Sequence, residues 1–150
     1  MIIRRAVPAD TPTLRAMMAS SNGYQDPAAR SMIFGFAAGW SVPDAGHEIW
    51  LAQDIHAVAG FYALIPLGKD QELDLFFTAN DAQGIGVGRR LFAHMAERAA
   101  ALDAKRVVIS SNPEAAAFYR RMGAVDIGVS PPGDGISWER PKLELVLPGA

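Results

Sequence analysis

The feature that most constrains the fold of this chain is a glycine-rich loop, Gln83 to Arg90, in which three glycines alternate with small apolar residues. A strand-like segment (73–78) precedes the loop, and a helix-like segment (89–102) follows it. Glycine lets the backbone come close to a ligand, and the N–H groups of a first helical turn have no partner in their own helix. This order of elements therefore predicts a binding site for a phosphorylated cofactor.

Length and composition narrow the class of protein. A chain of 150 residues predicts one domain, residues 1–150, with a core of its own. The net charge of -2 argues against a nucleic-acid partner, and the absence of cysteine excludes disulfides, thiolate metal sites and a cysteine nucleophile. No segment has the length of a membrane span or the pattern of a signal peptide. We therefore expect a cytoplasmic protein with no membrane partner and no metal.

Hydrophobic periodicity predicts an α/β (mixed α+β) fold. We expect a central mixed, mostly antiparallel sheet of about six to seven strands, flanked by about four helices. The strands before the glycine loop should be antiparallel, and the strand–helix–strand unit after it should be parallel. Asp10 is expected to cap the first helix and Gly123 to end the last one. The expected strands are 2–6, 48–52, 57–65, 73–78, 106–110, 125–129 and 143–147, and the expected helices are 11–19, 28–38, 89–102 and 114–122.

The spacing within the loop separates several kinds of glycine loop. A dinucleotide fingerprint needs Gly or Ala where this chain has Arg89, and an NTPase phosphate loop needs a Lys-Ser/Thr pair that is absent. The remaining pattern, Gln/Arg-x-x-Gly-x-Gly/Ala, is filled by Gln83, Gly86 and Gly88. It resembles the acetyl-CoA signature of the GNAT acetyltransferase superfamily. A tight connection without a ligand is the alternative interpretation.

A second motif strengthens this resemblance. The segment Asn112 to Ala124 is similar to the family's Asn-x-x-Ala-x-x-Phe-Tyr-x-x-x-Gly-Phe and departs from it only at Ala124. Both motifs occur in the family's order and spacing, and the resemblance covers essentially the whole chain. It implies a GNAT-like acyl-CoA N-acyltransferase fold. It also implies an acetyl-CoA-dependent N-acetyltransferase acting on a primary amine of a small molecule or a protein.

The resemblance also implies how acetyl-CoA (coenzyme A) is bound. Backbone N–H groups of the glycine loop would hold the pyrophosphate, and the strand before the loop would pair with the pantetheine arm. Asn112 would contact the pantetheine or cap the helix that follows it. The expected cofactor-binding residues are Phe76, Phe77, Thr78, Gln83, Gly84, Ile85, Gly86, Val87, Gly88, Arg89, Asn112, Ala115, Phe118 and Tyr119.

Acetyl transfer needs a neutral amine and a stabilised thiolate. Tyr119 stands at the family's general-acid position, although a helix packing face is the other interpretation of this aromatic pair. Glu72 and Asp74 lie two residues apart on one strand and therefore share a face, where either could act as base through water. Exposed surface carboxylates are the alternative. Without cysteine, direct attack of the amine in a ternary complex is the expected route.

The acceptor side is less specified by the sequence. The resemblance places it near the first helices and the final hairpin, where Tyr24 and Trp138 supply aromatic surface and Asp134 supplies negative charge. These are also ordinary loop residues. A non-catalytic CoA-binding regulatory module and an aminoacyl-RNA acetyltransferase are rival hypotheses, although the near-neutral charge opposes the second. A homodimer is a further expectation for this fold.

Overall fold

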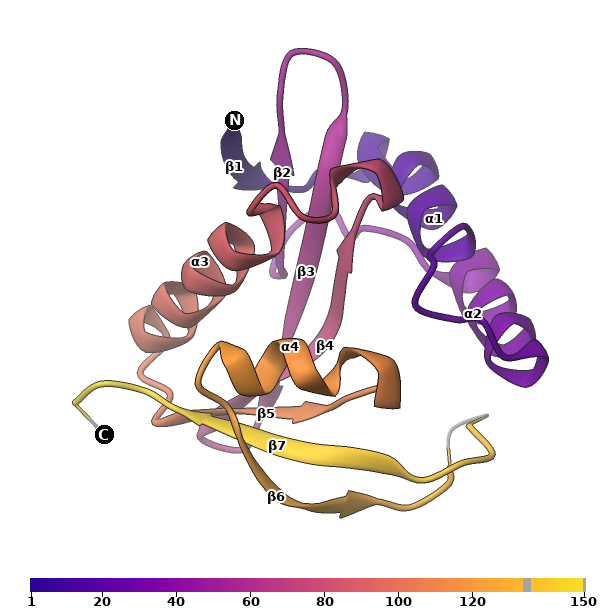
Figure 1. Ribbon diagram of the computed structural model, residues 1–150. Coiled ribbons are helices and arrows are strands. Elements are labelled where there is room, and N and C mark those ends of the chain that lie inside the picture. Colours follow the sequence, from indigo (N-terminus) through magenta and orange to yellow (C-terminus); the bar gives the residue numbers. More distant parts are fainter. Residues whose placement is uncertain (134–135, 150) are drawn as a thin grey trace. The chain divides into compact units, whose positions relative to one another are not determined.

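The computed structural model describes residues 1–133 and 136–149 (Figure 1). It contains a seven-stranded sheet in the order β1-β2-β3-β4-β5-β7-β6, which confirms the predicted mixed, mostly antiparallel sheet. No helix in the described ranges is long and apolar enough to cross a membrane. The strands are β1 (Ile2–Arg5), β2 (Glu48–Gln53), β3 (Val58–Leu67), β4 (Asp70–Thr78), β5 (Arg106–Ser110), β6 (Val125–Ser130) and β7 (Arg140–Val146), and the α-helices are α1 (Thr11–Ala19), α2 (Pro27–Gly39), α3 (Val87–Ala101) and α4 (Ala116–Arg121).

The chain divides into two compact units, each built from separate stretches of sequence. The first unit contains residues 1–63 and 75–91, and the second contains 64–74 and 92–150. The strands β3 and β4 and the helix α3 each contribute to both units. Neither unit is therefore a simple N-terminal or C-terminal half of the sequence.

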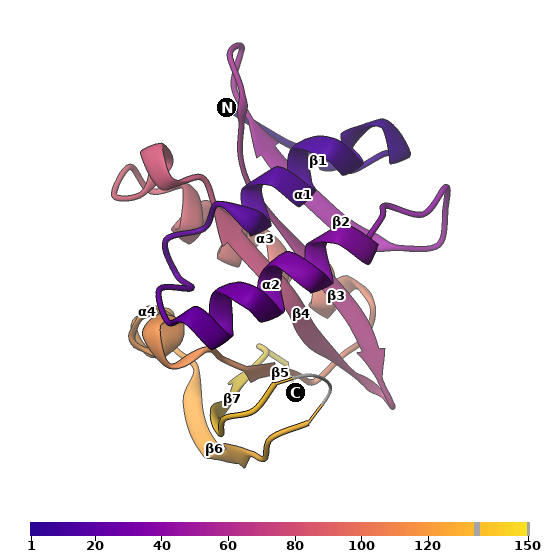
Figure 2. The same cartoon turned by 90° about the vertical axis from the view of Figure 1, so that its right-hand side faces the viewer.

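The core of the first unit lies between helices α1 and α2 and the strands beneath them. Figure 2 shows both helices across one face of these strands. Leu14, Met18 and Ile33 from the helices pack in one buried cluster with Phe61 and Phe77 from the strands. The two phenylalanine rings stack with centroids 5.7 Å apart. Burial of several large apolar side chains, each contributing roughly 1.5–3 kcal/mol, holds the helices on the sheet.

Helix α3 approaches strand β3 at a position where no side chain would fit. A Cβ atom added to Gly60 would lie 2.7 Å from the carbonyl oxygen of Phe77 and 2.8 Å from Cδ1 of Leu91. Real Cβ atoms do not come this close to other heavy atoms. Leu91 is fully buried, so its contact with the strand is part of the core. The absence of a side chain at Gly60 thus sets how closely the start of α3 sits on β3.

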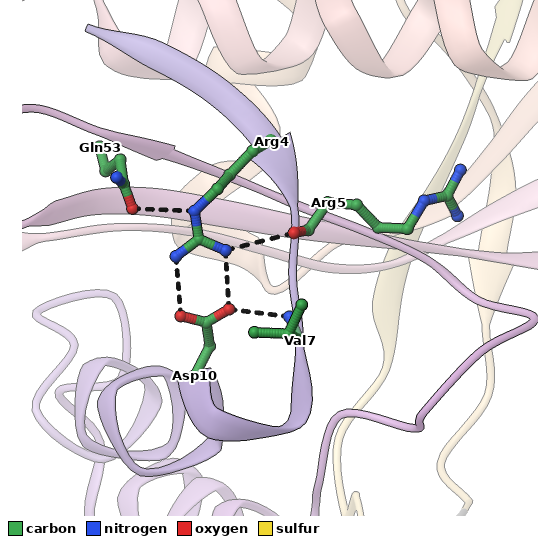
Figure 3. A network of polar contacts seen from close by, with 5 residues as sticks. All are labelled: Arg4, Arg5, Val7, Asp10 and Gln53. Carbon is green, nitrogen blue, oxygen red and sulfur yellow. Dashed lines mark hydrogen bonds and ion pairs between the residues drawn. The ribbon is translucent and has the colours of Figure 1, made fainter.

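A polar network ties the first strand to the start of α1 (Figure 3). The guanidinium of Arg4 donates two hydrogen bonds of 2.9 Å to the carboxylate of Asp10 and one of 3.0 Å to Oε1 of Gln53. The backbone N–H of Val7 donates to the same carboxylate at 2.8 Å. The prediction that Asp10 caps α1 is wrong, because its side chain makes no capping bond to that helix. The carboxylate is instead taken by a bidentate, doubly charged pair with Arg4, which adds a second charge and a second bond to what a cap bond would supply.

The strand–helix–strand unit after the glycine loop, β5–α4–β6, is parallel as predicted. Both of its strands pair antiparallel with β7, which lies between them. Strands β4 and β5 are parallel neighbours, with Glu72 opposite Val108. Helix α4 is shorter than predicted because a 3-10 turn, Pro113–Ala115, precedes it. The helix ends at Arg121 with Met122 at its C-cap, one residue earlier than predicted. Gly123 follows with φ of 102°, and its N–H donates to the carbonyl of Arg120 at 3.1 Å.

We predict that Asp10→Asn lowers stability in a pH-dependent way. The hydrogen bonds from Arg4 lower the pKa of the Asp10 carboxyl. The folded-state pKa therefore lies below the unfolded one, and this contribution is present above the ordinary aspartate range and lost as the pH falls through the lowered value. Urea unfolding at neutral pH should show a loss of about 1–2 kcal/mol, which shrinks in strong acid.

Asp126→Asn is the matched control for this substitution. It removes an ion pair with Arg120 in which both side chains are about half exposed. Exposed pairs of this kind contribute little to stability. Equal losses in the two variants, or a loss in Asp10→Asn that persists undiminished in strong acid, would contradict the assigned role of the network.

Candidate active site

The glycine loop of the first unit turns the chain from β4 into α3. Gly84 and Gly86 both have φ of 87°, a backbone conformation that residues with a side chain rarely adopt. Helix α3 begins at Val87, two residues earlier than predicted, and its first closing hydrogen bond runs from Arg90 N–H to the Gly86 carbonyl at 3.1 Å. The predicted loop residues are thus brought together at a helix N-terminus.

This turn leaves a run of backbone donors open. In the described part of the chain, the N–H groups from Gly84 to Arg89 have no hydrogen-bond acceptor. Arg90 donates from its side chain to the carbonyl of Met1 at 3.4 Å, whereas the Arg89 side chain is exposed and makes no such bond with a described residue. Several free N–H groups at the positive end of a helix dipole, with a cation beside them, form a concentrated anion site.

The end of β4 contributes to the site mainly through its backbone. Phe77 is 5% exposed, and its ring stacks on those of Phe61 and Tyr24. Its side chain therefore belongs to the core, and only its main chain remains to pair with a bound pantetheine arm. Phe76 and Thr78 are half-buried and stand on the opposite face of the strand. Tyr24 was predicted to bind the acceptor, and in the structure one face of its ring packs against Phe77.

The second motif lies in the second unit, where it forms an aromatic cluster. Tyr119 is 6% exposed, and its ring centroid is 5.5 Å from that of Phe118 and 6.2 Å from that of Phe92. Phe92 comes from α3, so the cluster fastens α4 to that helix. Asn112 precedes the 3-10 turn without a side-chain capping bond.

The two carboxylates of β4 alternate with buried leucines, as predicted. Glu72 is half-buried and Asp74 is exposed, whereas Leu73 and Leu75 are buried. Burial raises the pKa of the Glu72 carboxyl, and the neighbouring Asp74 raises it further. Although Asp74 reaches solvent, desolvation by the surrounding protein raises the pKa of its carboxyl as well. Both groups are therefore weaker acids, and stronger bases, than ordinary carboxyls.

Two cations near these carboxylates were not predicted as site residues. The charges of Arg140 and Lys142 on β7 act on Glu72 and partly offset the rise of its pKa. The signal in the sequence is the period-two charge pattern Arg140-x-Lys142-x-Glu144 on the last strand. Trp138, predicted to bind the acceptor, is half-buried just before this strand, and Asp134 lies outside the described residues.

Comparison with known proteins identifies the family. The profile of the acetyltransferase (GNAT) domain matches residues 40–145, which is most of the chain. The chain belongs to the GNAT acetyltransferase family. It is an N-acetyltransferase, and acetyl-CoA is its acetyl donor.

Individual relatives agree with this assignment. The chain is 27% identical over 142 residues to the 5-NmdU N-acetyltransferase of Pseudomonas phage PaMx11, covering 91% of this chain and 96% of that protein. A GCN5-related N-acetyltransferase from Rhodopseudomonas palustris superposes with a TM-score of 0.82 at 19% identity, covering 97% of this chain and 95% of that one. A GNAT acetyltransferase from Elizabethkingia anophelis, solved with acetyl-CoA bound, superposes with a TM-score of 0.71 at 17% identity, covering 97% of each chain. These solved structures share the fold.

We predict that Gly86→Glu abolishes acetyl-CoA binding. The substitution places a carboxylate among the open N–H groups and forces a side chain onto a residue with φ of 87°. Calorimetric titration with acetyl-CoA measures the effect. Gly46→Glu is a control with comparable backbone strain, since Gly46 has φ of 74° but lies in the exposed loop before β2. Wild-type affinity in Gly86→Glu would remove the loop from the cofactor site.

Proposed function

We propose that this GNAT enzyme transfers the acetyl group to a primary amine of a small molecule or a protein by direct attack in a ternary complex. The amine nitrogen attacks the thioester carbonyl carbon, the C–N bond forms, and the C–S bond breaks. The amine loses a proton to a base, and the departing thiolate gains one from an acid. The observation that carries the proposal is the run of open N–H groups from Gly84 to Arg89, which suits the pyrophosphate of the donor.

The base in this proposal is a carboxylate of β4. Both Glu72 and Asp74 have raised pKa values, so each binds a proton more readily than an ordinary carboxylate does. Glu72 is the better candidate because burial and the neighbouring carboxylate both favour its protonated form. Proton removal through an intervening water fits a carboxylate at the edge of the solvent.

The acid in this proposal is Tyr119. A phenol stays protonated at neutral pH and can donate to a thiolate, whose conjugate acid has a pKa not far from its own. Packing against Phe92 and Phe118 restricts the ring, so the hydroxyl is held in one place. The same packing would occur in a non-catalytic CoA-binding module, which is the alternative function that the burial of Tyr119 favours.

Residues 1–150 are proposed to act as one GNAT domain, because the family match and the phage relative both extend across the two units. A homodimer is supported by the edge strand β6, which exposes Val125, Ile127 and Val129. A net charge of -2 supports an acceptor other than nucleic acid. We also propose that the enzyme is cytoplasmic and has no membrane partner.

The test is an acetyl-CoA turnover assay that follows thiol release against a panel of acceptors. The panel contains small primary amines, peptides with free N-termini and 5-NmdU, the acceptor named for the phage relative. Amine-dependent thiol release is expected for at least one acceptor class. Calorimetric acetyl-CoA binding without release on any acceptor would support the regulatory module instead.

In the same assay, Tyr119→Phe should lower kcat by about 100-fold and leave the KM for acetyl-CoA nearly unchanged, because the lost hydroxyl acts in the transition state. Tyr62→Phe is the matched control, since Tyr62 is a fully buried tyrosine of β3 outside the proposed machinery. Wild-type turnover in Tyr119→Phe at every pH would exclude this residue as the acid.

The pH profile tests the base. Because the pKa of Glu72 is raised, kcat/KM should fall in acid with an apparent pKa above the ordinary glutamate value of about 4.3. We call this fall the acid limb of the profile. In Glu72→Gln, kcat/KM should no longer fall in acid, and turnover should be lowered by about 100-fold. In Asp74→Asn the fall in acid should remain. Glu72→Gln should also be more stable than wild type at neutral pH. A carboxyl with a raised folded-state pKa stabilises the fold fully below its unfolded pKa, and this contribution is lost as the pH rises through the folded-state value. An unchanged limb in Glu72→Gln would exclude it as the base.

A further inference from the structure

One face of the sheet in the second unit carries charges of both signs. Strand pairing places Lys142 opposite Ser110 and Arg140 opposite Ser130. Cross-strand partners and every second residue of a strand share a face. Glu72 joins this face because it lies opposite Val108, which in turn lies opposite Glu144. We call the set of Glu72, Asp74, Ser110, Ser130, Arg140 and Lys142 the mixed-charge face.

The middle of this face is polar and concave. The hydroxyl groups of Ser110 and Ser130 lie 2.7 Å apart and share a hydrogen bond. These serines come from β5 and β6, which flank β7, so the bond passes over the strand between them. Neighbouring strands are about 4.8 Å apart, and two side chains can meet across a third strand only if the sheet curls toward them. The sheet is therefore curled toward this face.

The cations of the mixed-charge face differ from a neighbouring cation in how they are compensated. Arg106, just outside the face, is paired with Asp70 at 3.1 Å and with Glu144 at 2.9 Å. On the face itself, neither Arg140 nor Lys142 forms an ion pair with any residue in 1–133 or 136–149. The Nε atom of Arg140 is buried and lacks a hydrogen-bond partner within the same ranges. A buried unpaired donor is costly, and an anionic ligand would compensate this group.

The carboxylates stand apart from these cations on the same face. Glu72 and Asp74 make no ion pair with a described residue, although the charges of Arg140 and Lys142 are close enough to act on Glu72. Strands β4 and β7 are separated only by β5, a spacing of about 10 Å. Side chains that extend inward from both strands leave a gap of a few ångströms between opposite charges. A molecule with a cationic and an anionic group would bridge that gap.

We propose that the acceptor is an amine that also carries an anionic group, with the amine held at Glu72 and Asp74 and the anion held at Arg140 and Lys142. This inference rests on the proposed acetyl transfer at the same carboxylates. A free amino acid, whose ammonium and carboxylate are separated by one carbon atom, has the required chemistry. An aminoalkyl phosphate shares it. Recognition of both charges fixes the orientation of the amine, and a plain amine would lack that second anchor.

The first experiment compares acceptors in matched pairs. Free L-amino acids are assayed against their amides, and ethanolamine phosphate is assayed against ethanolamine, with thiol release as the readout. We expect kcat/KM to be at least 10-fold higher for an anionic member than for its neutral partner. A preference confined to amino acids or to the phosphate identifies the source of the anion. Equal or better turnover of the neutral amines overturns the inference while leaving acetyl transfer itself established.

The second experiment uses two variants and a control. Arg140→Gln and Lys142→Gln should each lower the preference for the anionic acceptor by about 10-fold, mainly through its KM. Lys105→Gln removes an exposed lysine outside the face and should keep the wild-type preference. Acetyl-CoA affinity by calorimetry checks that each variant is folded. An unchanged preference in both Arg140→Gln and Lys142→Gln overturns the assignment.

A binding measurement covers the case in which no acceptor is turned over. Calorimetric titration of the protein with each matched pair, with coenzyme A present, should show tighter binding of the anionic member in wild type and its loss in Arg140→Gln. Such binding without turnover supports the recognition face and contradicts the proposed enzyme. Turnover or binding that ignores the anionic group contradicts the recognition face alone.

Discussion

Two backbone conformations in a short loop determine where the donor can bind. Gly84 and Gly86, each with φ of 87°, shape the last part of the connection from β4, which ends at Thr78, to α3, which begins at Val87. Residues with a side chain rarely adopt this backbone conformation. The first unit supports this turn by burying the end of β4 beneath α1 and α2, so the strand end and the helix start are both fixed. The anion site therefore depends on backbone strain that only glycine tolerates at low cost.

Much of the fold could be predicted because its determinants are local. Alternating apolar residues indicated the strands, and the motif spacing indicated the glycine loop and α4. The errors occurred where a distant group decided the outcome. Asp10 follows a helix-start pattern, but Arg4 on the neighbouring strand takes its carboxylate. Helix α4 loses its first turn to a 3-10 conformation at Pro113, which the apolar pattern does not reveal.

In the candidate site, too, some residues could be predicted from local motifs and others depend on distant parts of the chain. The motifs predicted the loop and Tyr119, but only the structure shows that Phe92 packs against that ring. The side chain of Phe77 points into the core, although the resemblance placed this residue at the cofactor. Arg140 and Lys142 could not be assigned from the sequence, because alternating charges on a last strand are typical of a solvated face. The pairing of β5 with both β4 and β7, which only the structure shows, places them on the same face of the sheet as Glu72.

The missing side chain at Gly60 has a consequence for the energetics of cofactor binding. Because α3 sits directly on β3 there, the start of the helix is held in place by core packing. A cofactor that meets a preformed cradle loses little affinity to the ordering of loops. Even a methyl group at this position would lift the helix away from the strand. Its effect would appear as weaker donor binding as well as lower stability, although the residue touches no ligand.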